Sequence, residues 1–385
     1  MLEWPSALQA GCLNSKSGGS SCPLPRQAAN RHHTNDDFDG ALMKAVRFKG
    51  AGLPVAIEEV PTPKAGPGQV VVKIGGAGVC HSDLHILQHG LGPLVNFTLG
   101  HENAGWIAEC GPGVTGFREG DGVAIYGPWG CGHCHACQCS MENYCENAGT
   151  LKGAGGGLGL DGGMAQYMLV PSTRLLVPLD GLEPRHAAPL SDAALTPYHA
   201  IKRVLPKLTP DTTVVVLGVG GLGHMAVQLL RVLSSVRIIA GDVDDAKLAQ
   251  AKKHGADHTV NTRHLESAID SIKGIVGPRG AVLVLDCVGI QPTIDLGAQV
   301  LGRDSHWSIV GLGGGHHDLH AGSAPFGCEI CTPFWGGRAE LMEVLALARS
   351  GRIAADITEY PLDKAPEVYE LLEKGRVSGR AVLIP

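Results

Sequence analysis

Residues 213–223 read TVVVLGVGGLG, and this stretch decides the fold of the second half of the chain. The continuous apolar run at 214–217 is typical of a strand buried on both faces of a parallel sheet. A G-x-G-x-x-G turn follows it directly, and the next residues carry apolar side chains at helical spacing. A glycine turn between a strand and a helix predicts a dinucleotide site, because the helix N-terminus offers unpaired N–H groups to phosphate.

The cofactor-binding residues expected in this turn are Gly218, Gly220, Gly221, Leu222 and Gly223. The first glycine allows the tight turn, the second lets the backbone approach the pyrophosphate, and the third lets the helix pack on the strand. Asp242 ends the next expected strand and can accept hydrogen bonds from both adenosine ribose hydroxyls. Its carboxylate would repel a 2'-phosphate, so the sequence favours NAD over NADP. The alternative is a glycine-rich turn that binds no ligand.

The sequence patterns before and after this turn differ, which predicts two domains. Further strands at 238–240, 282–285 and 308–310 alternate with helical patterns, one of them capped by Asp244 or Asp245 and ended by Gly255. Such alternation implies βαβ units in a doubly wound parallel sheet. The preceding part has short β-runs punctuated by Gly and Pro, which are typical of a β-rich module. These runs lie at 44–48, 55–60, 70–74, 106–110, 123–126 and 167–170.

The last segment of the chain, with a helix near 341–348 and a strand at 381–384, is expected to pack on the β-rich module that begins the chain. The expected catalytic domain therefore comprises 43–194 and 334–385, and the dinucleotide-binding domain comprises 195–333. Residues 1–42 are polar and lack apolar periodicity, so we expect a largely disordered extension that activity does not need.

Composition narrows the class of partner. The 385 residues are 44% hydrophobic and 18% charged, with a net charge of -6 and no long basic run. This argues against nucleic acid or an anionic membrane surface and favours a small-molecule substrate. No apolar run approaches the roughly 18 to 20 residues of a membrane-spanning helix, so a soluble protein is expected.

Five of the twelve cysteines lie between positions 131 and 145. Cys131, Cys134, Cys137 and Cys145 have the spacing C-x2-C-x2-C-x7-C, and four thiolates so close can complete a tetrahedral zinc shell. An iron–sulfur cluster is the chief rival, but the last spacing is longer than in the bacterial ferredoxin run and no proline follows. Cys139, His133 and His135 are treated as bystanders. Metal binding in a reducing cytoplasm is favoured over a disulfide set.

A second group of metal ligands is dispersed over Cys80, His101 and Asp192. One sulfur, one imidazole nitrogen and one carboxylate oxygen leave a fourth position open, which is the arrangement of catalytic rather than structural zinc. The alternatives are a core cysteine, a core histidine and a carboxylate that caps a turn.

The run Gly100-His101-Glu102, with Gly105, Gly111 and Val114 at their spacings, resembles the signature of the zinc-containing medium-chain alcohol dehydrogenases. The four-cysteine loop, the segment 80–85 and the glycine turn match that family in the same order, and the resemblance covers 43–385. It looks closest to bacterial secondary-alcohol dehydrogenases of broad specificity. It implies a GroES-like catalytic domain, a Rossmann domain and an active site in the cleft between them. Animal-type members place cysteine where this chain has Asp192, whereas several bacterial members resemble it in using aspartate.

The resemblance also implies an activity and roles for further residues. The activity is NAD-linked, reversible oxidation of alcohols, mainly secondary ones, to ketones or aldehydes by hydride transfer with two zinc ions per chain. Ser82 would lie beside the substrate oxygen and relay its proton through the cofactor ribose to His85. Asp83 would orient the ligating histidine, Glu102 would replace water at the metal transiently, and Arg380 would contact a cofactor phosphate. For His85 and Arg380, a plain surface residue is the alternative.

Several expectations remain open at this point. His81, Trp129, Phe326 and Trp335 are expected to line an apolar substrate pocket or to be ordinary packing residues. The rival functions are an aldehyde- or formaldehyde-type dehydrogenase of the same plan and a catalytically silent member. A cytoplasmic homo-oligomer, either a dimer or a tetramer, is expected.

Overall fold

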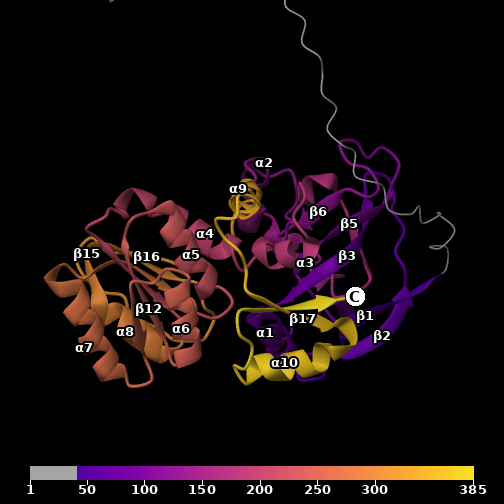
Figure 1. Cartoon of the computed structure of the whole chain (residues 1–385). Coiled ribbons are helices and arrows are strands. Elements are labelled where there is room, and N and C mark those ends of the chain that lie inside the picture. Colours follow the sequence, from indigo (N-terminus) through magenta and orange to yellow (C-terminus); the bar gives the residue numbers. More distant parts are fainter. Residues whose placement is uncertain (1–40) are drawn as a thin grey trace, which may run out of the picture. The chain divides into compact units, whose positions relative to one another are not determined.

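The computed structural model describes residues 41–385 (Figure 1). The extension expected over 1–42 lies outside the described residues apart from its last two positions, and Leu42 already begins the first strand, β1 (Leu42–Phe48).

The glycine turn lies in a six-stranded sheet in which every neighbouring pair is parallel, with the order β13-β12-β11-β14-β15-β16. The strands are β11 (Thr213–Leu217), β12 (Arg237–Asp242), β13 (His258–Asn261), β14 (Ala281–Asp286), β15 (Leu301–Ile309) and β16 (Glu329–Cys331). This order reverses direction at β11, so the carboxyl end of that strand is the switch point where such sheets bind ligands. The predicted doubly wound sheet is confirmed. β13 was missed because three of its four residues are exposed and give no apolar run.

Helices cover both faces of this sheet (Figure 1). They are α5 (Gly223–Leu233), α6 (Asp245–Lys253), α7 (Leu265–Val276) and α8 (Gln291–Val300). Val214 and Val216 of β11 share one core cluster with residues of α5 and α6. Val215 and Leu217 share another with residues of α7 and α8. Successive strand residues point to opposite faces, which is why the sequence of β11 is apolar throughout.

A second, mostly antiparallel sheet has the order β10-β6-β5-β3-β18-β17, with β9 also paired to β3. Its strands are β3 (Val70–Val79), β5 (Glu102–Cys110), β6 (Gly122–Ile125), β9 (Tyr167–Val170), β10 (Leu176–Pro178), β17 (Ile357–Pro361) and β18 (Arg380–Ile384). The C-terminal strand β18 lies between β17 and β3, with Ala381 opposite Val79. A smaller sheet joins β1, β2 (Ala56–Pro61) and β4 (Phe97–Thr98). Two short strands, β7 (Gly155–Gly156) and β8 (Gly159–Leu160), pair with each other.

β3 is longer than its sequence pattern indicates, because it continues through three glycines after Ile74. Glycine weakens a strand, so the apolar strand pattern in the sequence ends at Ile74. A Cβ atom at Gly78 would overlap the carboxylate of Glu102 on the neighbouring strand β5, so the missing side chain makes room for a buried acid. This strand leads directly into the site described below.

The remaining helices are α1 (His81–His89), α2 (His135–Gln138), α3 (Pro184–Ala187), α4 (Leu195–Lys202), α9 (Arg338–Arg349) and α10 (Ala365–Glu373). Among residues 41–385, no helix combines the length and the apolar character needed to cross a membrane.

Candidate metal and cofactor site

Three chain segments bring the dispersed ligand residues together. Cys80 lies between the end of β3 and the start of α1, His101 directly precedes β5, and Asp192 precedes α4. One ligand atom each from Cys80, His101, Asp192 and Glu102 lies within 4.8 Å of the others, and all four residues are buried. The Oδ2 atom of Asp192 lies 3.6 Å from both Cys80 Sγ and His101 Nε2.

This donor set fits a zinc ion. His101 Nε2 is buried without a hydrogen-bond partner among the described residues, which is costly unless the nitrogen binds something else. Sulfur, imidazole nitrogen and carboxylate oxygen are all zinc ligands, and three protein ligands leave a position for a substrate. Cys80 and Asp192 as anions with a neutral His101 would balance the charge of Zn²⁺.

Two neighbours fix the orientation of these ligands. Asp83 Oδ1 lies 3.1 Å from His101 Nδ1, and its Oδ2 accepts a hydrogen bond of 3.0 Å from the Cys80 backbone N–H. Thr196 Oγ1 donates a 2.6 Å hydrogen bond to Asp192 Oδ1, which leaves Oδ2 directed at Cys80 and His101. Sequence reasoning named Asp83 but missed Thr196, although a threonine four residues beyond the expected ligand Asp192 was a usable signal.

A buried ion pair adjoins the ligands. Glu102 is fully buried, and Arg380, only 3% exposed, donates hydrogen bonds from Nε (2.9 Å) and Nη2 to its carboxylate. Arg380 Nη2 also lies 3.7 Å from Asp192 Oδ2. The alternative of a solvated charge at Arg380 is therefore wrong, because a neighbouring carboxylate holds the guanidinium in the interior.

The acids respond differently to this environment. Burial raises the pKa of Glu102 to about 7, although Arg380 opposes the shift. Burial alone would raise the pKa of Asp192 as well, but without an ion the charge and hydrogen bonding of His101, whose own pKa the nearby Asp83 raises, together with Arg380, outweigh burial and hold the Asp192 pKa at about 2. Asp192 is thus the acid that stays ionised near neutral pH and suits a cation.

The glycine turn lies next to Arg380. Gly218 has φ +79°, a left-handed conformation that glycine adopts without strain, and a Cβ atom at Gly223 would overlap the Gly218 carbonyl oxygen. A Cβ atom at Gly221 would overlap Arg380 Nη1, so the turn approaches the residue that contacts Glu102 and Asp192. The metal-ligand group and the dinucleotide turn are thereby joined through one side chain.

Asp242 is held at the rim of this turn. Its Oδ2 accepts a 2.8 Å hydrogen bond from the Val219 N–H, and its Oδ1 accepts one of 3.0 Å from the Asp244 N–H. Each carboxylate oxygen can accept a further bond, so the residue can still serve ribose hydroxyls. Asp244 is the N-cap of α6 and accepts from the N–H groups of Ala246 and Lys247.

The four cysteines of the loop form a separate group, with sulfur atoms within 4.8 Å of one another. The Cys131 N–H donates to Cys145 Sγ (3.2 Å) and the Cys134 N–H donates to Cys131 Sγ (3.3 Å), as suits sulfur in thiolate form. Cys139, with His135 Nε2 3.9 Å from its sulfur, lies outside the group. Every cysteine within 41–385 is a free thiol.

The remaining predicted residues are placed as follows. Ser82 Oγ lies 3.6 Å from Cys80 Sγ, and half-buried His85 stacks on His89 with ring centroids 6.3 Å apart. The Trp335 ring meets His101 edge to face at 5.4 Å. Phe326 is 76% exposed and its carbonyl accepts a hydrogen bond from the Asp304 N–H, and its place in a substrate pocket stays a prediction.

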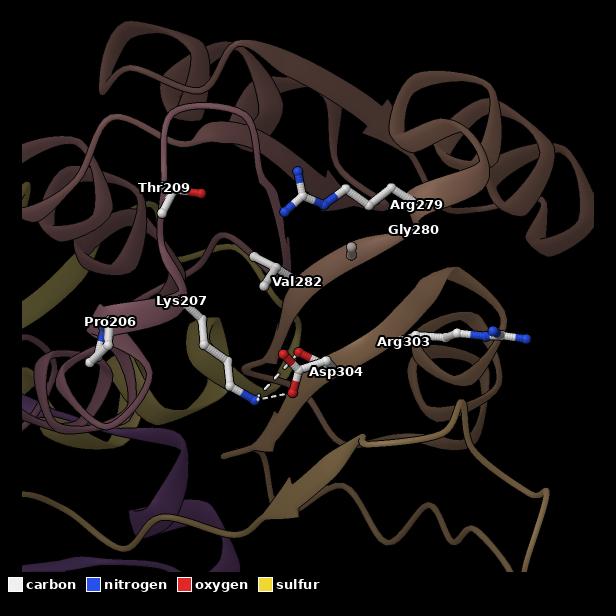
Figure 2. Close-up of a pocket in the computed structure, with 9 residues that line it drawn as sticks. Pro206, Lys207, Thr209, Arg279, Gly280, Val282, Arg303 and Asp304 are labelled. Carbon is white, nitrogen blue, oxygen red and sulfur yellow. Dashed lines mark hydrogen bonds and ion pairs between the residues drawn. The ribbon is translucent and has the colours of Figure 1, made fainter.

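A hollow on the surface of the parallel-sheet domain contains none of the predicted site residues. It is lined by Lys207, Arg279 and Asp304 among others, and the Lys207 ammonium group donates a hydrogen bond to the Asp304 carboxylate (Figure 2). Ala281 and Arg303, also in its lining, lie near the amino ends of β14 and β15. The glycine turn follows a carboxyl end, so this hollow is at the opposite edge of the sheet from the cofactor turn.

The family of the chain follows from comparison with known proteins. Residues 66–181 match the model of the alcohol dehydrogenase GroES-like domain, and residues 221–350 match that of the zinc-binding dehydrogenases. The chain belongs to the zinc-containing medium-chain alcohol dehydrogenase family. The predicted family and fold class, a GroES-like domain with a Rossmann domain, are confirmed.

Individual relatives agree with this assignment. An NAD-dependent alcohol dehydrogenase of Sulfurisphaera tokodaii is 34% identical over 89% of this chain and 100% of its own length. The crystal structure of the alcohol dehydrogenase from Aeropyrum pernix has a TM-score of 0.82 and 38% identity, covering 89% of this chain and all of that one. The acetophenone reductase of Geotrichum candidum, solved with NAD, has a TM-score of 0.79 and 31% identity, covering 89% and 97%.

Proposed function

We propose that this chain is an NAD-linked, zinc-dependent alcohol dehydrogenase that interconverts a secondary alcohol with its ketone. The observation that carries the proposal is the buried group of Cys80, His101 and Asp192, joined to the glycine turn through Arg380. The names of the relatives supply NAD and alcohol oxidation, and the acetophenone reductase favours ketones as the carbonyl partners.

Cys80, His101 and Asp192 would hold the catalytic zinc, and a zinc ion bound there supplies a Lewis acid that polarises the substrate oxygen. Asp83 keeps His101 oriented, so that its Nε2 is presented to the ion. Thr196 does the same for Asp192 through the hydrogen bond to Oδ1. Glu102, held by Arg380, is the proposed transient substitute for water. The four cysteines would hold the second, structural zinc.

The chain must also remove a proton from the alcohol. Ser82 is two residues from a ligand and lies against Cys80 Sγ, so its hydroxyl is the proposed first acceptor. His85 follows on the same helix and is half-buried, so we propose that its imidazole accepts the proton next and passes it on to solvent. Ser82→Ala should lower kcat by about 10²- to 10⁴-fold, the usual contribution of a proton-transfer group. Unchanged turnover would remove Ser82 from the path.

The dinucleotide would lie on the turn Gly218–Gly223, with Asp242 at its ribose and Arg380 at a phosphate; bound NAD supplies the hydride acceptor. The carboxylate of Asp242, 9% exposed, would repel a 2'-phosphate. Asp242→Asn should therefore narrow the preference for NAD over NADP. Saturation of the wild type by micromolar NADP and not by NAD would contradict this assignment.

The decisive experiment follows NADH absorbance against a panel of primary alcohols, secondary alcohols and formaldehyde, before and after chelation. A D-arabinose 1-dehydrogenase is 33% identical, so this sugar belongs in the panel. Preference for secondary alcohols that is lost on chelation and restored by zinc supports the proposal. Preference for formaldehyde favours the aldehyde-type alternative, and no turnover with fewer than two zinc ions per chain favours a silent member.

Three further expectations complete the proposal. The limits 43–194 with 334–385 and 195–333 are the proposed domains. A homo-oligomer is proposed because β16 is an edge strand, the segment before it exposes Leu312, Leu319 and Phe326, and unpaired edges invite pairing. Sedimentation analysis tests it. Cytoplasmic location is proposed because a four-thiolate site needs a reducing compartment.

A further inference from the structure

Trp335 has an unusual backbone conformation beside the ligand group. Its φ of +55° is left-handed, a conformation that residues with bulky side chains rarely adopt. Such strain persists only where surrounding contacts fix the residue. The side chain is nearly enclosed, with 6% of the residue exposed.

The indole contacts two of the three ligand residues or their immediate neighbours. The indole and the His101 ring pack edge to face at 5.4 Å between centroids, with the planes 73° apart. Its Nε1–H donates a 2.8 Å hydrogen bond to the carbonyl of Ser191, the residue before Asp192. On the remaining side the indole lies against Gly127, where a Cβ atom would overlap it.

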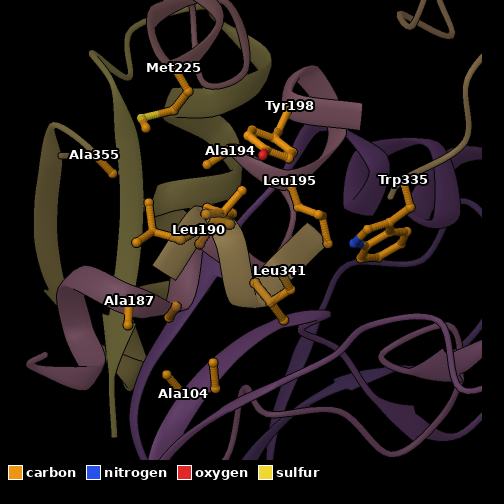
Figure 3. Close-up of a cluster of buried hydrophobic side chains, with 14 of the residues drawn as sticks. Ala104, Ala187, Leu190, Ala194, Leu195, Tyr198, Met225, Trp335, Leu341 and Ala355 are labelled. Carbon is orange, nitrogen blue, oxygen red and sulfur yellow. The ribbon is translucent and has the colours of Figure 1, made fainter. Parts of the chain in front are cut away.

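The segment that carries Trp335 is itself fixed at several points. Tyr126 Oη donates a 2.6 Å hydrogen bond to the Gly336 carbonyl, and Asn143 Nδ2 donates one of 2.8 Å to the Phe334 carbonyl. The Arg338 N–H donates to the Ser140 carbonyl at 2.9 Å. Asn143 and Ser140 belong to the four-cysteine loop, so this loop braces the segment from one side. Trp335 and Leu195, the first residue of α4, belong to the same hydrophobic cluster (Figure 3), and a Cβ atom at Gly336 would overlap Leu195 Cδ1.

We propose that Trp335 is a positioning residue for the metal centre, which holds the His101 ring and the backbone of Asp192 at the separation that the ion requires. The inference rests on the proposed catalytic zinc site. An aromatic residue that only lined a substrate pocket would need neither the bond to Ser191 nor a strained backbone. The hydrogen bond to Ser191 acts on the backbone next to Asp192, and the ring contact acts on His101. These two ligands are 91 positions apart in sequence, so the single side chain of Trp335 sets their relative placement.

The test measures zinc release from the fully loaded protein to a chromophoric chelator, without any substrate. Cys80→Ala identifies which release phase belongs to the catalytic ion. Trp335→Ala should speed that phase by about 10-fold or more, since groups that orient ligands change metal affinity by about 10- to 100-fold. The phase of the four-cysteine site reports whether the variant is folded. Trp106→Ala, which removes an indole that is 40% exposed, is the control and should leave both phases unchanged.

Two milder variants keep the test valid if Trp335→Ala does not fold. Trp335→Phe keeps a ring against His101 but loses the bond to Ser191, and Tyr126→Phe frees the Gly336 carbonyl; both should speed the Cys80-dependent phase by a smaller factor. Wild-type release from all folded Trp335 variants, with altered KM for bulky ketones, would show a substrate wall and overturn the inference. Absence of a Cys80-dependent phase in the wild type would instead overturn the metal centre of the proposed function.

Discussion

Replacing Arg380 by leucine tests the electrostatic arrangement at the centre of the site. Arg380 is 3% exposed, donates two hydrogen bonds to the fully buried Glu102 and lies 3.7 Å from Asp192. Leucine fills part of the space but leaves both carboxylates without their cation. Breaking a buried ion pair by removing one partner typically destabilises a protein by about 3 to 5 kcal/mol, so we expect a loss of this size in the free energy of unfolding.

The assay is urea unfolding followed by tryptophan fluorescence, at about pH 8.5 so that Glu102, whose pKa burial raises to about 7, is ionised. The double variant Glu102→Gln/Arg380→Leu should be more stable than the sum of the single losses indicates, with a coupling of about 1 to 3 kcal/mol. Arg349→Leu is the matched control, because Arg349 is 30% exposed and pairs with a largely exposed Asp180. Its loss should stay below about 1 kcal/mol.

NADH binding gives a second, independent result. Because Arg380 lies against Gly221 of the cofactor turn, Arg380→Leu should also weaken NADH binding, whereas Arg349→Leu should not. A loss of stability below about 1 kcal/mol for Arg380→Leu, or strict additivity with Glu102→Gln, would refute the reasoning about the buried pair.

Three other predictions follow from the described contacts. His224 is buried, and its Nδ1 lies 2.9 Å from the Gly220 carbonyl oxygen. Burial lowers the pKa of His224 from 6.5 to about 4. As the pH falls below about 6.5, this histidine therefore takes up a proton in the unfolded chain before it does so in the folded chain. Urea unfolding should show a loss of about 2 kcal/mol from this group between pH 7 and pH 5, and His224→Gln should lack that part of the loss. Gly223→Ala should weaken NADH binding at least about 10-fold in a fluorescence titration, because its Cβ would overlap the Gly218 carbonyl oxygen, whereas Gly274→Ala, with open space around it, should not. Cys137→Ser should lower the zinc content from two ions per chain to one by elemental analysis, and a content still near two would remove this cysteine from the structural site.

The parts of the fold and site that could be predicted from sequence are those whose key residues lie close together along the chain. The apolar run of β11, the glycine turn after it and the capping Asp244 each depend on neighbours within a few positions. The four cysteines lie within fifteen residues, so their common site follows from composition and spacing. Tetrahedral coordination by adjacent thiolates needs little help from the rest of the chain.

The contacts that sequence reading missed join distant positions. Arg380 and Glu102 are 278 residues apart, and nothing in either local pattern indicates that the two charges are buried together. The second half of β3 was hidden because its glycines fit crowded neighbours and do not follow strand propensity: a Cβ atom at Gly78 would overlap Glu102, and those at Gly75 and Gly76 would overlap Trp106 and the Arg185 backbone. Phe326 is hydrophobic yet 76% exposed, and it lies shortly before the edge strand β16, a position that its local sequence does not indicate.

The position of β18 affects the order in which this enzyme can mature on the ribosome. β3 occupies residues 70–79, yet the strand that pairs with it on one side is made about 300 residues later. At about 5 to 20 residues per second, one edge of β3 waits about 15 to 60 s for its neighbour, while the nucleotide-binding sheet between them is already translated and free to fold. Arg380 arrives with that strand, so the acidic interior around Glu102 acquires its cation only in the last moments of synthesis.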